Sequence, residues 1–266
     1  MKIKNIFIKI LLILLNFFHK RNDKTFEGQY KSFNDIRNKY KIAEYSNIEN
    51  YDHSLNAAKN NLQLYKECSY YLEKSSGNRF KILSSYLAAK KKSRYAILDI
   101  GGSYGQLYYY LKNSLPLKTI SLMVYELPDF INIFSHLHSK NINFVSDIDS
   151  TSFNADIIHF GSSLQYFEDH LKFLKKIIRL KAEAIVLTDI LINHKSSFIV
   201  AQTNMRDRII PVNIIYFEQL NNIFKSYNYK LAHYSESFYP EHNFNNYTNA
   251  ISHTKFLNLI YINSDD

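Results

Sequence analysis

The sequence of 266 residues contains a single cysteine and no tryptophan. One cysteine excludes an internal disulfide and a zinc site built from several cysteines, which fits a reducing cytoplasm. Cys68 falls in a helical segment and is predicted to be a packing residue rather than a nucleophile. Histidines such as His136 and His138 do not fall near acidic residues at the spacing of metal ligands, so we expect no metal site.

The chain also lacks a concentrated run of one charge. Its net charge is +9, but lysine and arginine are scattered among asparagine, isoleucine and tyrosine over the whole length. Proteins that bind nucleic acid gather basic residues on one stripe, often with interleaved aromatic residues. We find no such stripe and expect no nucleic-acid partner.

No apolar run is long enough to cross a bilayer, which takes roughly 20 residues. The longest candidate lies within Met1–Arg21, where Ile10–Phe18 is flanked by lysines and followed by Lys20 and Arg21. A cleaved signal peptide would need a small-residue site that is absent here. The segment predicts either an amphipathic helix on the inner face of the cytoplasmic membrane or a helix packed on protein.

Glycine is scarce, and three of the six glycines fall within Gly101–Gly105. The apolar run Tyr95–Ile100 precedes them, which predicts a central parallel strand with helices on both faces. Asp99 lies near the carboxyl end of this strand, where a carboxylate can accept hydrogen bonds from a ligand in the crevice above. Glu126 ends the next predicted strand, 126 − 105 = 21 residues after the last glycine, and about 20 is typical of a ribose-binding acid. The stretch predicts a nucleoside pocket.

Two common nucleotide motifs do not fit these glycines. A dinucleotide fingerprint that starts at Gly101 would need glycines where Ser103 and Gln106 stand. A P-loop would need a lysine directly after its last glycine, but the first lysine after Gly105 is Lys112. The pocket is therefore not predicted to hold a dinucleotide or a triphosphate.

The same stretch resembles motif I, D-x-G-x-G-x-G, of the Rossmann-like (class I) S-adenosylmethionine-dependent methyltransferases. Asp99, Gly101 and Gly105 are in register with it, and a serine stands at the middle glycine. Glu126 stands where that class places the acid for the ribose hydroxyls. The resemblance covers about Arg94–Ile262 and implies an α/β fold: a seven-stranded, mostly parallel sheet with an antiparallel closing hairpin. It also implies S-adenosyl-L-methionine as the cofactor.

The resemblance further implies cofactor contacts at the carboxyl ends of several strands. Phe144–Asp147 stands where the class places a turn that faces adenine, and small residues at 161–162 would let a flat ligand lie against the backbone. The cofactor-binding residues expected in this way are Asp99, Gly101, Gly102, Ser103, Gly105, Glu126, Leu127, Asp147, Gly161, Ser162 and Gln165.

A hydrolase is the main alternative. Gly101–Gly105 also spells G-x-S-x-G, a nucleophile elbow with Ser103 as nucleophile, and Asp189 and His242 follow in the right chain order. In that fold several strands precede the elbow, whereas this string follows the first clear strand. Its place in the chain therefore favours the methyltransferase. A non-catalytic scaffold that binds the nucleoside is the remaining alternative.

The fifth predicted strand, Glu183–Ile190, ends in a second carboxylate, Asp189, which could orient or deprotonate an acceptor hydroxyl. By contrast, His159 lies in the middle of its strand and is predicted to be a hydrogen-bonded core residue. The segment Leu191–Asn213 is predicted to be a long polar loop that forms the acceptor-binding wall. Among its polar residues are His194, Gln202, Arg206 and Arg208. The catalytic residues we expect are Asp189, His194 and Gln202.

The segment Phe26–Phe33 repeats aromatic residues and glycine outside any regular period, which predicts an ordered loop. It resembles the aromatic-x-G-x-Y-x-S-W box of a family of bacterial methyltransferases associated with surface-polysaccharide gene clusters. Phe26, Gly28, Tyr30 and Ser32 match this box, Phe33 replaces its tryptophan, and Gln165 and Tyr166 match a later run of the family. The resemblance implies methylation of an oxygen or nitrogen of a glycan or glycan precursor. The box is expected either to pack its aromatic rings on the main domain as a clasp or to contact the substrate.

Three units are expected along the chain. Residues 1–21 form the amphipathic N-terminal helix, residues 22–92 the aromatic loop and a helical cap, and residues 93–266 the Rossmann-like domain. The helical cap is predicted from the apolar spacing within Asn34–Lys92. We expect this cap to cover the pocket.

Overall fold

The structure is a computed structural model, and it describes residues 25–40, 79–203, 209–237 and 249–264. Strands and helices alternate along most of these ranges, which confirms the predicted α/β class. The strands are β1 Phe26–Tyr30, β2 Arg94–Ile100, β3 Thr119–Tyr125, β4 Ile142–Val145, β5 Ile157–Gly161, β6 Ala184–Asn193, β7 Phe198–Gln202, β8 Ile210–Tyr216, β9 Tyr229–Glu236 and β10 Thr254–Asn263. The helices are α2 Phe33–Tyr40, α5 Arg79–Ala89, α6 Gln106–Ser114, α7 Pro128–Phe134, α8 His170–Ile178 and α9 Phe217–Ser226, with 3-10 turns η2 Ser135–Leu137, η3 Leu164–Tyr166 and η5 Asn249–His253.

Several predictions fall outside the described residues. They concern Met1–Arg21, most of the helical cap, Cys68, Arg206, Arg208 and His242. Helices α2 and α5 are the parts of the cap that the structure describes. Within the described ranges, no helix is long and apolar enough to cross a membrane.

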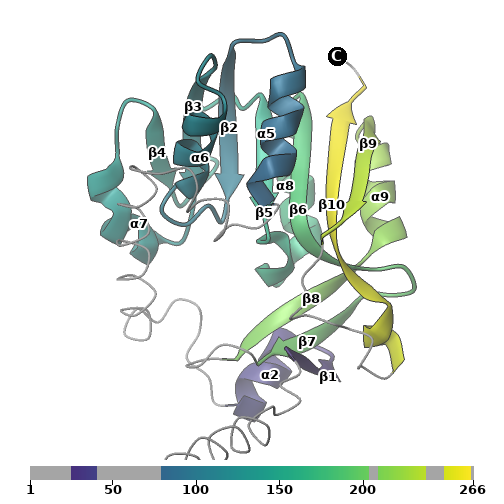
Figure 1. Ribbon diagram of the computed structural model, residues 1–266. Coiled ribbons are helices and arrows are strands. Elements are labelled where there is room, and N and C mark those ends of the chain that lie inside the picture. The colour runs from purple at the N-terminus through teal and green to yellow at the C-terminus, as the bar shows by residue number, and fades with distance from the viewer. Residues whose placement is uncertain (1–24, 41–78, 204–208, 238–248, 265–266) are drawn as a thin grey trace, which may run out of the picture.

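Seven strands form the main sheet, in the order β4–β3–β2–β5–β6–β10–β9 (Figure 1). Strands β2 to β6 pair in parallel, and β10 runs antiparallel to both β6 and β9. This is the predicted seven-stranded sheet with its antiparallel closing strands. The chain runs outward from β2 to β4 and then returns to β5 on the other side of β2. In open α/β sheets, such a switch in strand order marks the crevice in which ligands bind.

Helices cover both faces of this sheet. Helices α5, α6 and α7 pack on one face, where Leu83, Leu107 and Phe134 join one apolar core. Helices α8 and α9 pack on the other face, where Leu174 and Phe224 join a second core. The central strands β2, β5 and β6 carry buried residues on both sides because both of their faces are covered, as a parallel sheet requires.

The predicted loop Leu191–Asn213 is wrong, because it contains the end of β6, strand β7 and the start of β8, and the last two belong to a second, smaller sheet. Strands β7 and β8 pair antiparallel, β1 pairs antiparallel with β7, and β8 runs parallel to the end of β6. Figure 1 shows these strands beyond the carboxyl ends of the parallel strands. Val200, Val212 and Ile214 bury their side chains in a third apolar core with Phe26. The polar residues between β7 and β8 made the whole segment resemble a loop, so its buried apolar residues were not predicted.

Strand β6 connects the two sheets through a β-bulge. Ile190 pairs with Leu257 and Leu187 with Leu259, so Thr188 and Asp189 together face the single residue Asn258 of β10. Asp189 has a left-handed φ of 56°, and its N–H donates to Asn258 Oδ1 at 3.1 Å. The predicted end of this strand at Ile190 is wrong, because β6 bends at the bulge and continues to Asn193 beside β8.

The aromatic box is also not a loop, because its first half is strand β1. Phe26 pairs with Gln202 of β7, and its ring is buried in the third core. The register shifts between Glu27 and Tyr30, where Gly28 has a φ of 69°. A Cβ at Gly28 would lie 2.6 Å from the Tyr30 ring, so only glycine fits under this ring. The irregular spacing of the box is the spacing of a bulged strand.

The second half of the box begins helix α2 with a reciprocal cap. Ser32 Oγ accepts from the N–H of Asp35 at 3.2 Å, and Asp35 Oδ2 accepts from the N–H of Ser32 at 3.0 Å. Phe33 and Ile36 bury their side chains, and α2 packs against β8. Burial of the Phe26 and Phe33 rings supports the clasp interpretation over a substrate contact for these two rings.

Candidate functional site

The glycine turn lies at the carboxyl end of β2, beside the switch in strand order. Gly101 and Gly105 have left-handed φ values of 69° and 75°, and Ser103, which lies between them, has a φ of 51°. Ser103 thus adopts the conformation that favours glycine, at a cost of roughly 1 kcal/mol. A Cβ at Gly102 would lie 2.4 Å from Asp99 Oδ2, so this position admits only glycine. The turn therefore combines three left-handed residues with a buried Gly102 that packs on the Asp99 carboxylate.

Glu126 stands beside this turn, one residue after β3. Its Oε2 accepts from the Ser103 N–H at 3.0 Å, and its Oε1 accepts from the Leu127 N–H at 3.2 Å. Burial raises the pKa of the Glu126 carboxyl, and these two N–H groups oppose the rise. Leu127 is 38% exposed beside it. The structure therefore brings four predicted cofactor residues, Gly101, Gly102, Ser103 and Glu126, to one place.

Asp147 lies on the turn after β4, the neighbour of β3. Its Oδ1 accepts from the N–H of Asp149 at 3.0 Å, and its carbonyl accepts from Ser150 Oγ at 2.7 Å. Asp149 in turn pairs with Lys176 of α8 at 2.6 Å. These contacts fix the turn at the same edge of the sheet, and a contact of Asp147 with adenine stays a prediction.

The turn after β5 contributes Gly161, Ser162 and Gln165. A Cβ at Gly161 would lie 2.8 Å from His159 Cε1 and 3.0 Å from Arg79 Cδ, so glycine is needed there as well. Gln165 is fully buried, and its Nε2 donates to Ser162 Oγ at 3.0 Å. Gln165 therefore holds the turn in shape, and its direct contact with a cofactor stays a prediction.

Asp99 faces inward, toward the neighbouring strand. Its Oδ1 lies 2.8 Å from Nδ1 of His159 on β5, and only 2% of Asp99 is exposed. His159 is a buried core residue with hydrogen bonds on both ring nitrogens, as predicted. Asp99 shapes the glycine turn from below, and its direct contact with a ligand stays a prediction.

The three predicted catalytic residues do not converge. Asp189 is 1% exposed and its Oδ2 lies 3.2 Å from Arg79 Nε, on the face that α5 covers. His194 lies beyond the end of β6, where it packs on the Phe217 ring of α9 at 5.0 Å. Gln202 ends β7, and its Oε1 accepts from the Tyr166 hydroxyl at 3.0 Å. Asp189 and His194 therefore contact opposite faces of the sheet.

Two residues at the site were missed in the sequence analysis. Arg79 begins α5, packs over Gly161 and pairs with Asp189. Asn213 of β8 donates from Nδ2 to the carbonyls of Gln165 and Phe167, at 3.3 and 2.8 Å. An arginine before the first predicted strand and an asparagine within a predicted loop give no pattern that would reveal these roles.

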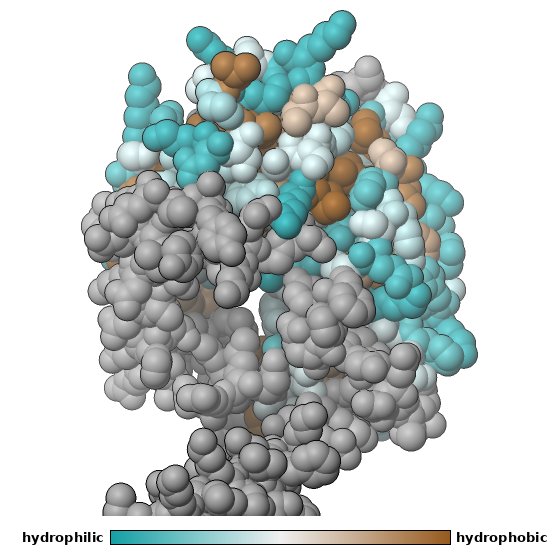
Figure 2. All heavy atoms as spheres, in the orientation of Figure 1, coloured by the Kyte–Doolittle hydropathy of each residue, from teal (hydrophilic) through white to brown (hydrophobic). Residues whose placement is uncertain are grey.

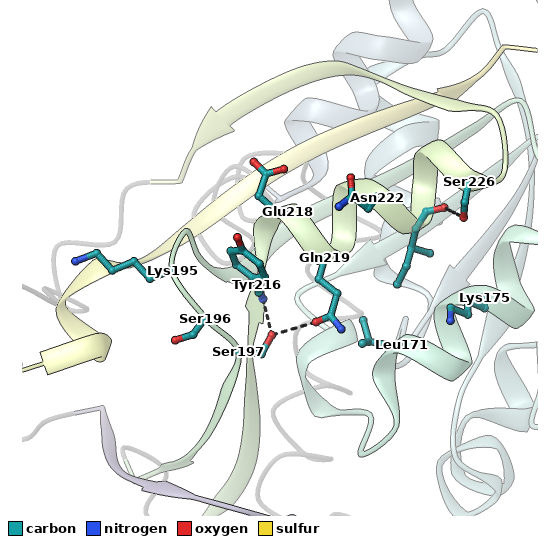
Figure 3. A pocket seen from close by; sticks show the side chains of 11 residues that line it. Leu171, Lys175, Lys195, Ser196, Ser197, Tyr216, Glu218, Gln219, Asn222 and Ser226 are labelled. Carbon is teal, nitrogen blue, oxygen red and sulfur yellow. Dashed lines mark hydrogen bonds between the residues drawn. The ribbon is translucent and has the colours of Figure 1, made fainter.

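A groove of about 810 Å³ lies between α8 and α9, away from these strand ends (Figure 3). Ser197 Oγ, on its wall, accepts from the Tyr216 N–H at 2.9 Å and donates to Gln219 Oε1 at 3.4 Å. None of the residues that line this groove is a predicted cofactor-binding or catalytic residue. We assign this groove no part in the site.

The hydrolase hypothesis places its base at His242, which lies outside the described residues. Both ring nitrogens of His159 are taken by Asp99 and Thr188. Asp189, the proposed orienting acid, is paired with Arg79. The described geometry does not support this alternative.

No family model matches the sequence, and no curated protein matches it. Solved structures match the fold. A 1,6-didemethyltoxoflavin-N1-methyltransferase from Burkholderia thailandensis, bound to S-adenosylhomocysteine, has a TM-score of 0.50 and 11% identity over 84% of this chain and 93% of that chain. A chain from the complex of the Haloferax volcanii Trm112 methyltransferase activator with a methyltransferase has a TM-score of 0.51 and 11% identity, covering 80% and 96%. At such identities the similarity shows the fold, which is the Rossmann-like α/β fold of these proteins.

Proposed function

We propose that this chain is an enzyme that transfers a methyl group from S-adenosyl-L-methionine. The observation that carries the proposal is the Glu126 carboxylate at the end of β3, hydrogen-bonded to the Ser103 N–H of the glycine turn. An acid in this position can accept both ribose hydroxyls of a nucleoside that lies on the turn. The fold shared with solved methyltransferases supports the same class.

The residues present fit this cofactor. The absence of a side chain at the half-buried Gly101 would let the ligand approach the turn, and a side chain at the buried Gly102 would collide with Asp99. Glu126 would hold the ribose, Asp147 would face the adenine, and carboxylates near the crevice would favour a cationic ligand. When bound, the cofactor supplies an electrophilic methyl group on a sulfonium. The chain supplies position, because alignment in line with the acceptor provides much of the rate of such a transfer.

We infer that Asp189, which is 1% exposed and fixed by Arg79 at 3.2 Å, is a positioning residue on the acceptor side of the site and does not itself contact the acceptor. The transfer would form a bond from the methyl carbon to an oxygen or nitrogen of the acceptor, break the carbon–sulfur bond of the cofactor and pass the acceptor's proton to water. Tyr166 and Gln202, joined by a hydrogen bond, extend the wall of the second sheet that would face the acceptor. Asn213 supports this wall by holding the turn after β5.

The acceptor we propose is a glycan or glycan precursor, methylated in the cytoplasm. Its support is the resemblance of the Phe26–Phe33 box and of the Gln165–Tyr166 pair to methyltransferases of surface-polysaccharide gene clusters. A reversible contact with the inner face of the membrane through residues 1–21 belongs to the same proposal. A small molecule of other chemistry is the competing acceptor.

Calorimetric titration of the purified chain with S-adenosylhomocysteine tests the enzyme class. We expect saturable binding of one ligand per chain. If the folded protein shows no binding, the proposal fails. Transfer of a labelled methyl group to a glycan fraction, compared with a peptide fraction and a small-amine fraction, then tests the acceptor.

A further inference from the structure

Three side chains from adjacent parallel strands form a buried hydrogen-bonded chain beneath the site. Asp99 of β2 lies 2.8 Å from His159 Nδ1, and Thr188 Oγ1 of β6 lies 3.1 Å from His159 Nε2. The exposed fractions of Asp99, His159 and Thr188 are 2%, 0% and 0%. Each polar group in the middle of an apolar sheet needs a hydrogen-bond partner, since a buried group without one lowers the stability of the fold by about 1 to 3 kcal/mol.

A proton on His159 Nδ1 would be donated to the Asp99 carboxylate, and the Thr188 hydroxyl would then donate to Nε2, so that every member has a partner. The order of groups is that of a nucleophilic triad, but Thr188 is closed to any substrate by its complete burial. The chain therefore does not act on a substrate directly.

Two of these side chains instead lie against the backbone at the site. Asp99 Oδ2 lies directly under Gly102 of the glycine turn, and the His159 ring lies under Gly161 at the end of β5. Thr188 reaches the following turn through its backbone carbonyl, which accepts from the Ser162 N–H at 2.8 Å. The chain thus connects the two ligand-facing turns to the strand that carries the bulge.

We propose that His159, through Asp99 and Thr188, positions the glycine turn for the cofactor and so sets the affinity of the site. These three are positioning residues. The inference rests on the proposed function for its ligand, S-adenosyl-L-methionine or its demethylated product. Its structural half, that the buried chain holds the turn, concerns the protein without ligand.

The first variant is Thr188→Val, which keeps the shape of the side chain and removes only the hydroxyl. His159→Phe is the second variant. It removes both hydrogen bonds of His159, so it also tests whether the protein folds without them. Amide hydrogen exchange is measured at Gly101 and Gly105, whose N–H groups bond to the Tyr125 and Gly102 carbonyls. We expect exchange about tenfold faster in the ligand-free variants and S-adenosylhomocysteine binding weaker by about tenfold or more. Thr188→Ser should restore both.

Tyr229→Phe is the matched control, because it also removes a buried hydroxyl, bonded to the Ala182 carbonyl at 2.7 Å. It should lower the melting temperature without changing exchange at the turn or ligand affinity. If Thr188→Val lowers stability as the control does and leaves both readouts unchanged, the chain is merely structural and the inference is overturned. If the wild-type protein binds no S-adenosylhomocysteine, the proposed function fails, while the exchange data still decide whether the chain holds the turn.

Discussion

Glu126 is the residue to which we assign the ribose of the cofactor. Its carboxylate is held by two backbone N–H groups at the glycine turn. Glu126→Ala should leave the fold intact and weaken S-adenosylhomocysteine binding by about 2 to 4 kcal/mol, the scale of lost charge-assisted hydrogen bonds. Glu183→Ala is the control, since Glu183 pairs with Lys92 at the opposite edge of the sheet. Equal affinity in folded Glu126→Ala would remove its role in ribose binding.

Ser103 separates a requirement for backbone shape from a requirement for a nucleophile. Its φ of 51° favours glycine, tolerates alanine and strains a β-branched side chain. We expect Ser103→Gly and Ser103→Ala to keep most methyl-transfer activity, and Ser103→Val to lose about 1 to 2 kcal/mol of stability. Melting curves and activity assays of the three variants check this. Loss of all activity in Ser103→Ala with intact cofactor binding would instead indicate a serine nucleophile.

His170 should give the fold an acid-sensitive component. Burial lowers the pKa of its ring from 6.5 to about 4, and among the described residues neither ring nitrogen has a hydrogen-bond partner. The unfolded chain takes up this proton near pH 6.5 and the folded chain only near pH 4. The free energy of unfolding should therefore fall as pH drops between these values, by up to about 3 kcal/mol.

Urea unfolding of wild type and His170→Phe at a series of pH values measures this component. His170→Phe should show a shallower loss of stability between pH 6.5 and 4. His138→Phe, at an exposed histidine, should keep the wild-type slope. Identical slopes in wild type and His170→Phe would contradict the assignment.

At the scale of elements, the bulge in β6 depends on one side chain of the neighbouring strand. Asn258 is buried, and its Oδ1 accepts the Asp189 N–H that the ladder leaves unpaired. Asn258→Ala should lower the free energy of unfolding by about 1 to 3 kcal/mol, because this N–H loses its acceptor. Asn258→Asp keeps an acceptor oxygen and should retain the bulge, as hydrogen exchange at Asp189 would show. Unchanged stability in Asn258→Ala would mean that the bulge does not need this contact.

The elements that the sequence predicted well are those with a local signature. Strands β2 to β5 are apolar runs that end in, or directly before, glycine, acid or small residues. The second sheet has no such signature, because β1 and β7 recognise each other across most of the chain. Gly28 and Ser32 are explained by a bulge and a helix cap, which sequence periodicity alone does not reveal.

The site was predicted in the same uneven way. The glycine turn and Glu126 follow from spacing along two consecutive strands, and the structure brings them together. Arg79 and Asn213 reach the site only through tertiary packing. Asp189 was singled out as a carboxylate at the end of a predicted strand, but its pairing with Arg79 depends on how α5 lies over the sheet.

At the scale of the whole molecule, polar side chains cover much of the face shown in Figure 2, over the helices and along the upper edge of the main sheet. Residues 1–21 lie outside the described part of the chain, and their contact with the membrane stays a prediction. Full-length protein should sediment with anionic vesicles, less so as salt rises, because Lys2, Lys4 and Lys9 attract anionic lipid. Protein that starts at Asn22 should stay in solution. Equal sedimentation of the two proteins, or none by either, would indicate packing on protein.

The pairing of β1 with β7 also sets an order of events during synthesis. Phe26 must find Gln202, 202 − 26 = 176 residues later in the chain. At 5 to 20 residues per second, a ribosome takes roughly 9 to 35 s to supply that partner. Throughout this interval the β1 sequence has no edge to join, and the charge of Glu27 and the kink at Gly28 make it a poor template for other strands. The second sheet is thus completed only after the ribosome has delivered the five parallel strands of the main sheet, β2 to β6.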